Sequence, residues 1–263
     1  MSGLITLVFV FILGSMIGSY LNVLIYRLPR EQDTVLSRSS CPHCQKKIFW
    51  YENIPIMSFI FLKGKCSGCK IGISFKYPLV EFFLGIIAIN LMPANFDIIS
   101  LYFFAFYLSV ASVFLVHFLI DLEFKLLPDK LNIYLAIVFL AHSLIFIDMS
   151  WTHWLLGLLI GFGFPYLVTW GFYKYSGKVG MGGGDIKLFG ALGLFLGPMG
   201  VMLTIFLSCF VGAITTLVLI LTKIVNKDEP VPFGPFIIIV ASVQIFFPTL
   251  FKELTQWLGI GGL

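Results

Sequence analysis

Long runs of apolar residues, separated by short polar stretches, follow one another along the whole chain. A transmembrane helix needs about 20 mainly apolar residues, and most of the runs approach this length. They predict eight membrane-spanning segments, at residues 4–26, 77–92, 98–120, 131–147, 153–173, 186–196, 201–224 and 233–247. The sixth is too short to cross untilted and could be half of a broken helix, which Pro198 after Gly197 ends in either case.

Composition agrees with this pattern. Hydrophobic residues make up 59% of the chain and charged residues 11%, and the mean hydropathy is +1.00. Ordinary soluble domains are about one quarter charged, so the chain is predicted to be a polytopic membrane protein. The first run has neither a basic region before it nor a small-residue cleavage site after it, which favours a retained span over a removed signal peptide.

Basic residues predict the orientation of the spans. Of the 17 Lys and Arg residues, all except Lys252 fall on one side of the predicted membrane. The positive-inside rule therefore places these loops in the cytoplasm and both chain ends outside. The net charge of +4 is thus explained by membrane orientation, and it gives no reason to expect a nucleic-acid partner.

The largest predicted cytoplasmic loop holds two CxxC pairs, Cys41 with Cys44 and Cys66 with Cys69. Two such pairs can close a tetrahedral four-thiolate shell around zinc. Disulfides are the weaker interpretation, because cytoplasmic thiols stay reduced. Four protein ligands leave no open position for a substrate, so we expect a structural metal that stabilises a small domain.

The predicted fold class is therefore an all-α polytopic membrane protein of about eight transmembrane helices, with a small cytoplasmic zinc-binding domain inserted after the first. The expected borders are a first transmembrane helix at residues 1–26, the four-cysteine domain at 27–76, a membrane domain at 77–249 and a C-terminal tail at 250–263.

Carboxylates are scarce in the membrane part, where ionisable groups usually have a function. Asp121 ends the third predicted span and Asp185 opens the sixth, so topology brings two acids 64 residues apart to the same membrane face. If their helices pack together, the two carboxylates can share a proton and a water, as in an aspartic protease. The alternative is a simple hinge in which Asp185 caps a helix. Asp129 competes with Asp121 as the partner, but N-capping of the next span already explains it.

Glycines 180 and 182–184 precede Asp185 directly. Glycine allows close approach of other groups at an entropic cost, which fits a backbone that passes near a catalytic pair or binds an extended peptide. Lys187 follows two residues later and is interpreted first as a cytoplasmic anchor, with contact to lipid phosphate or to an acidic substrate residue as the lesser possibility. Glu81, in the second span, is either a structural hydrogen-bond acceptor or a group that receives a substrate amine.

The motif GMGGGD at residues 180–185 and the segment LIDLEFKLLPD at 119–129 resemble the type IV prepilin peptidases, also called leader peptidases. The resemblance extends over nearly the whole chain, through GSYLNVLIYRLPR at 18–30, WYENIPIMSF at 50–59, KYPLVEFF at 76–83 and VPFGPFIIIVA at 231–241. The two CxxC pairs match the long, bifunctional form of the family. Gly183, Met16 and Tyr20 are mild departures from its usual motifs.

The resemblance implies an intramembrane aspartic endopeptidase of the bacterial inner membrane. It would remove the leader of type IV prepilins or type II secretion pseudopilins after a glycine, on the cytoplasmic face. The motif match places the catalytic pair on Asp121 and Asp185, with Gly180, Gly182, Gly184 and Lys187 in the supporting loop. The resemblance also implies a methyltransferase that uses S-adenosylmethionine on the new N-terminal amine. No motif assigns residues to that cofactor.

Two other classes of protein remain open. An ion-coupled transporter could use intramembrane acids to carry protons, although the chain shows no obvious internal repeat and both acids lie at one face. A non-catalytic assembly subunit of a pilus or secretion system is the other possibility. Such a subunit should tolerate Asp→Asn at positions 121 and 185, whereas a protease should not.

Overall fold

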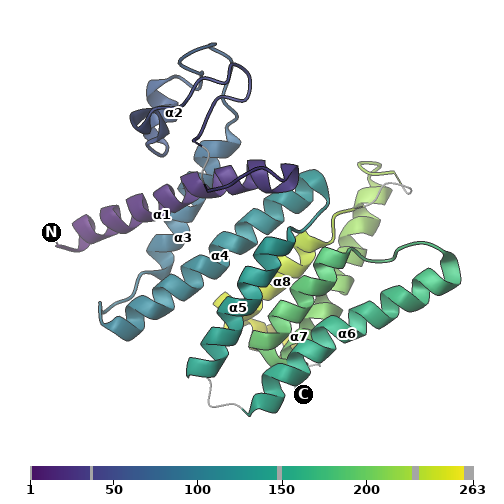
Figure 1. Cartoon of the computed structure of the whole chain (residues 1–263). Coiled ribbons are helices and arrows are strands. Elements are labelled where there is room, and N and C mark those ends of the chain that lie inside the picture. The colour runs from purple at the N-terminus through teal and green to yellow at the C-terminus, as the bar shows by residue number, and fades with distance from the viewer. Residues whose placement is uncertain (1, 36–37, 147–149, 227–230, 258–263) are drawn as a thin grey trace. The chain divides into compact units, whose positions relative to one another are not determined.

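A computed structural model describes residues 2–35, 38–146, 150–226 and 231–257 of the chain. These residues form helices joined by turns, with two isolated β-bridges, so the predicted all-α class is confirmed. The helical elements (Figure 1) are α1 (Ser2–Arg27), η1 (Leu28–Arg30), η2 (Trp50–Asn53), α2 (Met57–Phe61), α3 (Lys76–Leu91), α4 (Ile98–Phe124), α5 (Asp129–Phe146), α6 (Trp151–Ser176), α7 (Gly183–Leu221), α8 (Gly234–Phe246) and α9 (Pro248–Trp257). The chain divides into two compact units, residues 1–112 and 113–263, called here the N-terminal and C-terminal units.

Small residues let α1 and α3 pack closely in the N-terminal unit. A Cβ atom built on Gly14 would lie 2.7 Å from the Ala88 side chain, and one on Gly18 would lie 2.8 Å from the Glu81 backbone. On the facing helix, Gly85 lies against the Phe11 ring. Small residues at such crossings are typical of membrane helices, where van der Waals packing between backbones replaces the hydrophobic driving force.

The loop between η1 and α3 contains the same turn twice. The Gln45 N–H donates to the Cys41 carbonyl at 2.9 Å, and the Lys70 N–H donates to the Cys66 carbonyl at 3.0 Å. Gln45 and Lys70 both have positive φ, 57° and 62°. An isolated β-bridge flanks each turn. The two CxxC pairs thus fold into matching knuckles.

In the C-terminal unit, α7 packs against α5, α6 and α8 (Figure 1). The contact of α7 with α6 is made by backbone, because Gly157 and Gly161 of α6 lie against the carbonyls of Gly193 and Phe189. We call this contact the glycine seam. From α5, the Ser143 hydroxyl donates to the Leu194 carbonyl at 3.1 Å. Backbone packing and this buried hydrogen bond fix α7 against both neighbours.

Helix α7 is interrupted at Gly197, whose φ of 71° and ψ of −175° are not helical. Pro198 follows, and it lacks the N–H needed to continue a helix. The side chain of His153 occupies the space where a Cβ of residue 197 would lie, so only glycine fits there. The break predicted at this position is confirmed.

The predicted count of eight spans is not confirmed. Within the described residues, five helices are long and apolar enough to cross a membrane, namely α1, α4, α5, α6 and α7. A sixth span is possible if α8 and α9, bent by 111°, are taken together. Helix α3 has 16 residues, fewer than the usual span of about 20. The sixth predicted segment and most of the seventh fall within the single interrupted helix α7.

Candidate functional site

Asp121 lies in the last turn of α4 and is 4% exposed. Its Oδ2 atom accepts the Gly234 N–H at 2.8 Å. Gly234 begins α8, so this hydrogen bond joins α4 to α8 through two residues that are 113 positions apart in the sequence. Gly234 lies in the VPFGPF segment, and no pattern in the sequence predicts its contact with Asp121.

Asp185 lies in the first turn of α7 and is 8% exposed. The Gly182 backbone lies close to its carboxylate, since a Cβ built on Gly182 would lie 2.8 Å from Asp185 Oδ2. The other carboxylate oxygen, Oδ1, is buried and has no hydrogen-bond partner among the described residues. Asp185 and Asp121 are near enough for their carboxylates to repel one another electrostatically. The structure thus brings these two predicted residues together.

Leu127, between α4 and α5, packs against two glycines that neighbour the acids, Gly184 and Gly234. A Cβ built on Gly184 would lie 2.9 Å from the Leu127 Cβ and carbonyl oxygen. A Cβ built on Gly234 would lie 2.7 Å from Asp121 Oδ2 and 3.1 Å from Leu127 Cδ2. Both positions therefore require glycine for close approach around the two carboxylates.

Two buried polar residues beside this pair were not singled out from the sequence. Asn132 of α5 is 2% exposed, and its Nδ2 donates to the Gly184 carbonyl at 3.1 Å. His117, one helical turn before Asp121, is fully buried beside the Asn132 side chain. Its ring nitrogens approach this side chain but make no hydrogen bond of good geometry within the described part of the chain. A polar residue inside an apolar run was the signal that could have found both.

Asp129 and Lys187 form an exposed ion pair with Nζ to Oδ2 at 2.7 Å. Their side chains are 56% and 47% exposed. Asp129 begins α5 and Lys187 lies in the first turns of α7, so the pair joins these two helix ends. This pairing was not predicted from the sequence. Of the other predicted loop residues, Gly180 lies against the Phe172 ring and is exposed.

The four predicted metal ligands converge in the N-terminal unit. The sulfur atoms of Cys41, Cys44, Cys66 and Cys69 all lie within 4.8 Å of one another. Cys41 Sγ is 3.9 Å from Cys69 Sγ, and Cys44 Sγ is 4.0 Å from Cys66 Sγ. A tetrahedral zinc with Zn–S bonds of about 2.3 Å requires sulfurs about 3.8 Å apart. The four thiols therefore fit a zinc ion.

The knuckle backbone prepares one of these thiols for metal. The N–H groups of Cys69 and Gly68 point at Sγ of Cys66 and lower the pKa of that thiol to about 6. A thiol with this pKa is largely thiolate at neutral pH, which is the form that binds metal.

A second polar cluster supports the loop. Lys46 Nζ lies 3.2 Å from Glu52 Oε1 and donates to the Ser67 hydroxyl at 2.6 Å. Hydrogen bonds from Ser67 and from the Phe49 N–H hold the pKa of Glu52 below its usual range.

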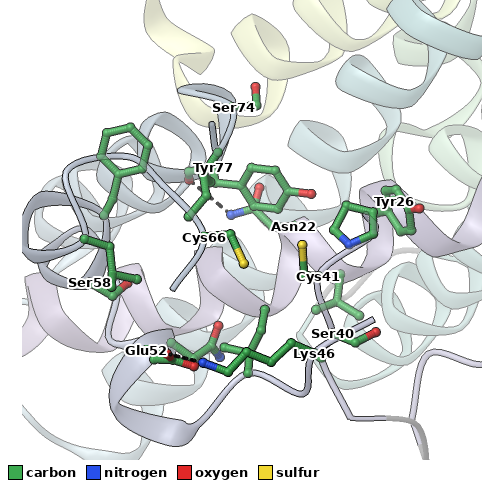
Figure 2. Close-up of a pocket in the computed structure, with 18 of the residues that line it drawn as sticks. Asn22, Tyr26, Ser40, Cys41, Lys46, Glu52, Ser58, Cys66, Ser74 and Tyr77 are labelled. Carbon is green, nitrogen blue, oxygen red and sulfur yellow. Dashed lines mark hydrogen bonds and ion pairs between the residues drawn. The ribbon is translucent and has the colours of Figure 1, made fainter. Parts of the chain in front are cut away.

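A cavity of about 450 Å³ lies within the N-terminal unit, between the four-cysteine loop and the facing sides of α1 and α3. Figure 2 shows Asn22 and Tyr26 of α1 around it, together with Cys41, Cys66 and the Lys46–Glu52 pair. The Asn22 side chain donates to the Tyr77 carbonyl at 3.1 Å. The volume of the cavity lies in the range of about 300–1,000 Å³ that is usual for small-molecule sites.

Two family models match the chain. The model of the bacterial peptidase A24 N-terminal domain matches residues 12–94, and that of the type IV leader peptidase family matches residues 108–217. A prepilin leader peptidase/N-methyltransferase of Aeromonas hydrophila is 34% identical, covering 94% of this chain and 92% of the relative. The chain belongs to the type IV leader peptidase family. The family model spans both Asp121 and Asp185, and the N-terminal model spans the four cysteines.

Other members of the type IV leader peptidase family agree with this assignment. Proteins with the same name from Stutzerimonas stutzeri and Pseudomonas aeruginosa are each 32% identical, over 90% of this chain and 89% and 88% of their own lengths. No solved structure matches the chain significantly. Family membership and several apolar helices together make the chain a multi-pass membrane protein.

Proposed function

We propose that this chain removes the leader of type IV prepilins or pseudopilins after a glycine, by a mechanism that uses Asp121 and Asp185, and then N-methylates the new N-terminal residue. Its relatives carry the name prepilin leader peptidase/N-methyltransferase, which supports both activities. The observation that carries the peptidase part is the buried pair of carboxylates at the ends of α4 and α7.

Two neighbouring buried carboxylates suit peptide hydrolysis by water. Because like charges at close range cannot both be ionised easily, the pair shares one proton. The ionised carboxylate takes a proton from a water held between the two, and the protonated one donates to the scissile carbonyl. The free Oδ1 atom of Asp185 supports this role, since it is a buried acceptor without a partner among the described residues.

The glycines around the pair support binding of an extended peptide. A Cβ at Gly182 would lie 2.8 Å from Asp185 Oδ2 and one at Gly184 would lie 2.9 Å from Leu127, whereas a Cβ at Gly183 would meet no atom within 4 Å. Gly180 and Lys187 are proposed to complete this active-site loop. The Lys187 ion pair with Asp129 supports a role in holding the start of α7 in place.

The methyl-transfer part is proposed for the N-terminal unit, with S-adenosylmethionine as the methyl donor. The four cysteines would hold a structural zinc, because four protein thiolates complete a tetrahedral shell and leave no open position. The proposed domains keep the predicted borders, with the zinc-binding domain at residues 27–76 and the peptidase domain at 77–249. Methylation then depends on the loop together with the parts of α1 and α3 that face it, and proteolysis depends on the helices around the two aspartates.

The proposed location is the bacterial inner membrane, with the aspartates and the zinc domain facing the cytoplasm. The proposed topology retains eight crossings. An unbroken helix of 39 residues would be about 58 Å long, nearly twice the hydrocarbon thickness of about 30 Å. The break at Gly197 supports two separate crossings within α7.

The test uses the purified full-length protein and a prepilin-type peptide, with and without S-adenosylmethionine. Mass spectrometry reports leader loss and methyl addition separately. Asp121→Asn and Asp185→Asn should each lower cleavage by about 10³-fold or more, because each removes half of an acid–base pair. Cleavage by both variants at the wild-type rate would refute the two-aspartate mechanism, and no cleavage by the wild-type protein would leave the transporter or assembly-subunit interpretation standing.

A further inference from the structure

The cavity of the N-terminal unit is lined by two carboxylates, Glu52 and Glu81, which differ in their neighbours. Glu52 has a cationic partner, Lys46, at 3.2 Å. It also accepts the Phe49 N–H at 3.0 Å. Its charge is therefore already balanced within the loop, and it is well placed to hold the loop together.

Glu81 has neutral partners. Its side chain comes from α3, is 8% exposed, and accepts the Ile56 N–H at 2.7 Å through Oε2. The Ser19 hydroxyl of α1 lies beside this carboxylate. No Lys or Arg among the described residues forms an ion pair with it within 4 Å. A buried carboxylate is costly unless a positive group approaches, so a cationic ligand in the cavity would be stabilised beside Glu81.

We propose that this cavity is the methyl-transfer site, that it takes a methyl-sulfonium donor of the S-adenosylmethionine type, and that Glu81 accepts the proton of the substrate amine. The proposal rests on the methylation part of the proposed function, and it assigns that activity to a place in the chain. Both reactants are cations when they arrive, a sulfonium and an N-terminal ammonium. Glu81 is the cavity carboxylate whose charge no described basic residue balances.

The residues fit this chemistry in size, and the lining offers both signs of charge: Arg27 and Lys47 suit the carboxylate of the donor, and Glu81 suits its sulfonium. A volume of about 450 Å³ can hold a nucleoside-sized ligand. Figure 2 shows Asn22 and Tyr26 on the α1 side of the cavity, and these polar groups can hydrogen-bond to a ligand.

The proton and electron balance is simple. The substrate ammonium gives one proton to the Glu81 carboxylate and becomes a neutral amine. The amine lone pair forms an N–C bond to the methyl carbon while the C–S bond breaks, and the electron pair of that bond stays on sulfur. The product is a methylated ammonium and a neutral thioether, and Glu81 returns its proton to water. A carboxylate in hydrogen-bond reach of the amine is what this step requires.

The alternative is that Glu81 only ties the loop to α3 through the Ile56 N–H. Ile56 has a φ of 62°, which is unusual for a β-branched residue, so this tie is structurally important. Glu81→Gln separates the two roles, because a glutamine oxygen still accepts the Ile56 N–H but carries no charge and cannot take the proton. A purely structural role should survive this change.

The experiment measures ligand binding to the full-length protein by calorimetry and compares S-adenosylmethionine with S-adenosylhomocysteine, the neutral thioether of nearly the same shape. The wild type should prefer the cation by about tenfold or more, and Glu81→Gln should lose this preference while it binds the thioether as before. Methyl transfer to a pre-cleaved peptide should fall by about 100-fold or more, and leader cleavage should stay within about twofold of wild type. Asp97→Asn is the matched control, since Asp97 caps the start of α4 and does not line the cavity.

Each outcome is informative. If the wild type neither binds the donor nor transfers a methyl group, the methylation part of the proposed function fails. If the wild type does both and Glu81→Gln keeps the preference and the methylation rate, the assignment to Glu81 is overturned. If Glu81→Gln does not retain zinc, Ser58→Trp provides the test, because it fills the cavity from α2 without changing Glu81. Donor binding retained in that variant would refute the cavity as the site.

Discussion

Replacing Gly234 with alanine tests whether the position of the Asp121 carboxylate determines the rate of cleavage. Gly234 does not have positive φ, so alanine can adopt its backbone conformation. The substitution adds a single methyl group at the start of α8. It leaves both aspartates in the sequence, which makes it a milder and more specific perturbation than removing either acid.

The structure sets the size of the effect. The new Cβ would lie 2.7 Å from Asp121 Oδ2 and 3.1 Å from its Cγ, whereas ordinary contact begins at 3.4 Å. The carboxylate must therefore move by about 0.7 Å, and its hydrogen bond from the Gly234 N–H lengthens or breaks. Because a misplacement of about 1 Å can cost about 100-fold in rate, we expect kcat to fall by about 10- to 100-fold. Stability should fall by about 1–3 kcal/mol through the weakened buried hydrogen bond.

The assay is leader cleavage at several peptide concentrations, so that kcat and KM are obtained separately. KM should change little, since Gly234 is not proposed to bind the peptide. Gly163→Ala is the control, because a Cβ there meets no atom within 4 Å and the residue lies in the middle of α6. Normal kcat in a folded Gly234→Ala protein would refute the reasoning, and so would an equal loss in the control.

Three further predictions concern the loop and the helix ends. Cys44→Ser should release about one zinc per chain and abolish methylation before cleavage, as metal analysis and the two assays would show, because structural zinc binding supplies folding free energy; full zinc content would remove this residue from the shell. Because the folded-state pKa of Glu52 is depressed, its contribution to loop stability is present above the ordinary glutamate pKa of 4.5 and is lost as pH falls through the lower folded value. Glu52→Gln should therefore weaken this acid dependence in a proteolysis assay, and an unchanged pH profile would contradict the prediction. Asp129→Asn breaks the exposed ion pair with Lys187, so it should cost at most about 1 kcal/mol and leave cleavage largely intact; a loss as large as that of Asp185→Asn would mean that Asp129 is the catalytic partner.

Features that depend on short stretches of the sequence could be predicted from it. The helical class, the break at Gly197 and the convergence of the four cysteines depend on apolar run length, on a Gly-Pro pair and on CxxC spacing. The juxtaposition of Asp121 with Asp185 could be expected because the predicted topology places both acids at the same membrane face. Their catalytic role stays a prediction.

Features that depend on how helices meet could not be predicted. The Gly234 hydrogen bond to Asp121 crosses 113 residues, and the Ile56 hydrogen bond to Glu81 crosses 25. In a membrane protein nearly every helix face is apolar, so no alternation of polar and apolar positions tells which faces pack. The same lack of contrast explains why run length alone gave eight spans, while the structure joins two of these segments in α7.

The glycine seam sets how the protein can respond to membranes of different thickness. Helices usually accommodate a thicker or thinner bilayer by tilting or sliding past their neighbours. At the seam, the Gly157 and Gly161 backbones touch α7 directly, and a slide by one residue would bring a side chain into a space that holds none. Gly193 lies eight residues from Asp185, or about 12 Å along the helix, so the seam fixes the height of this carboxylate relative to α6. Hydrophobic mismatch must then be absorbed by the lipid or by other helices, and the depth of Asp185 beside α6 stays constant as membrane composition changes.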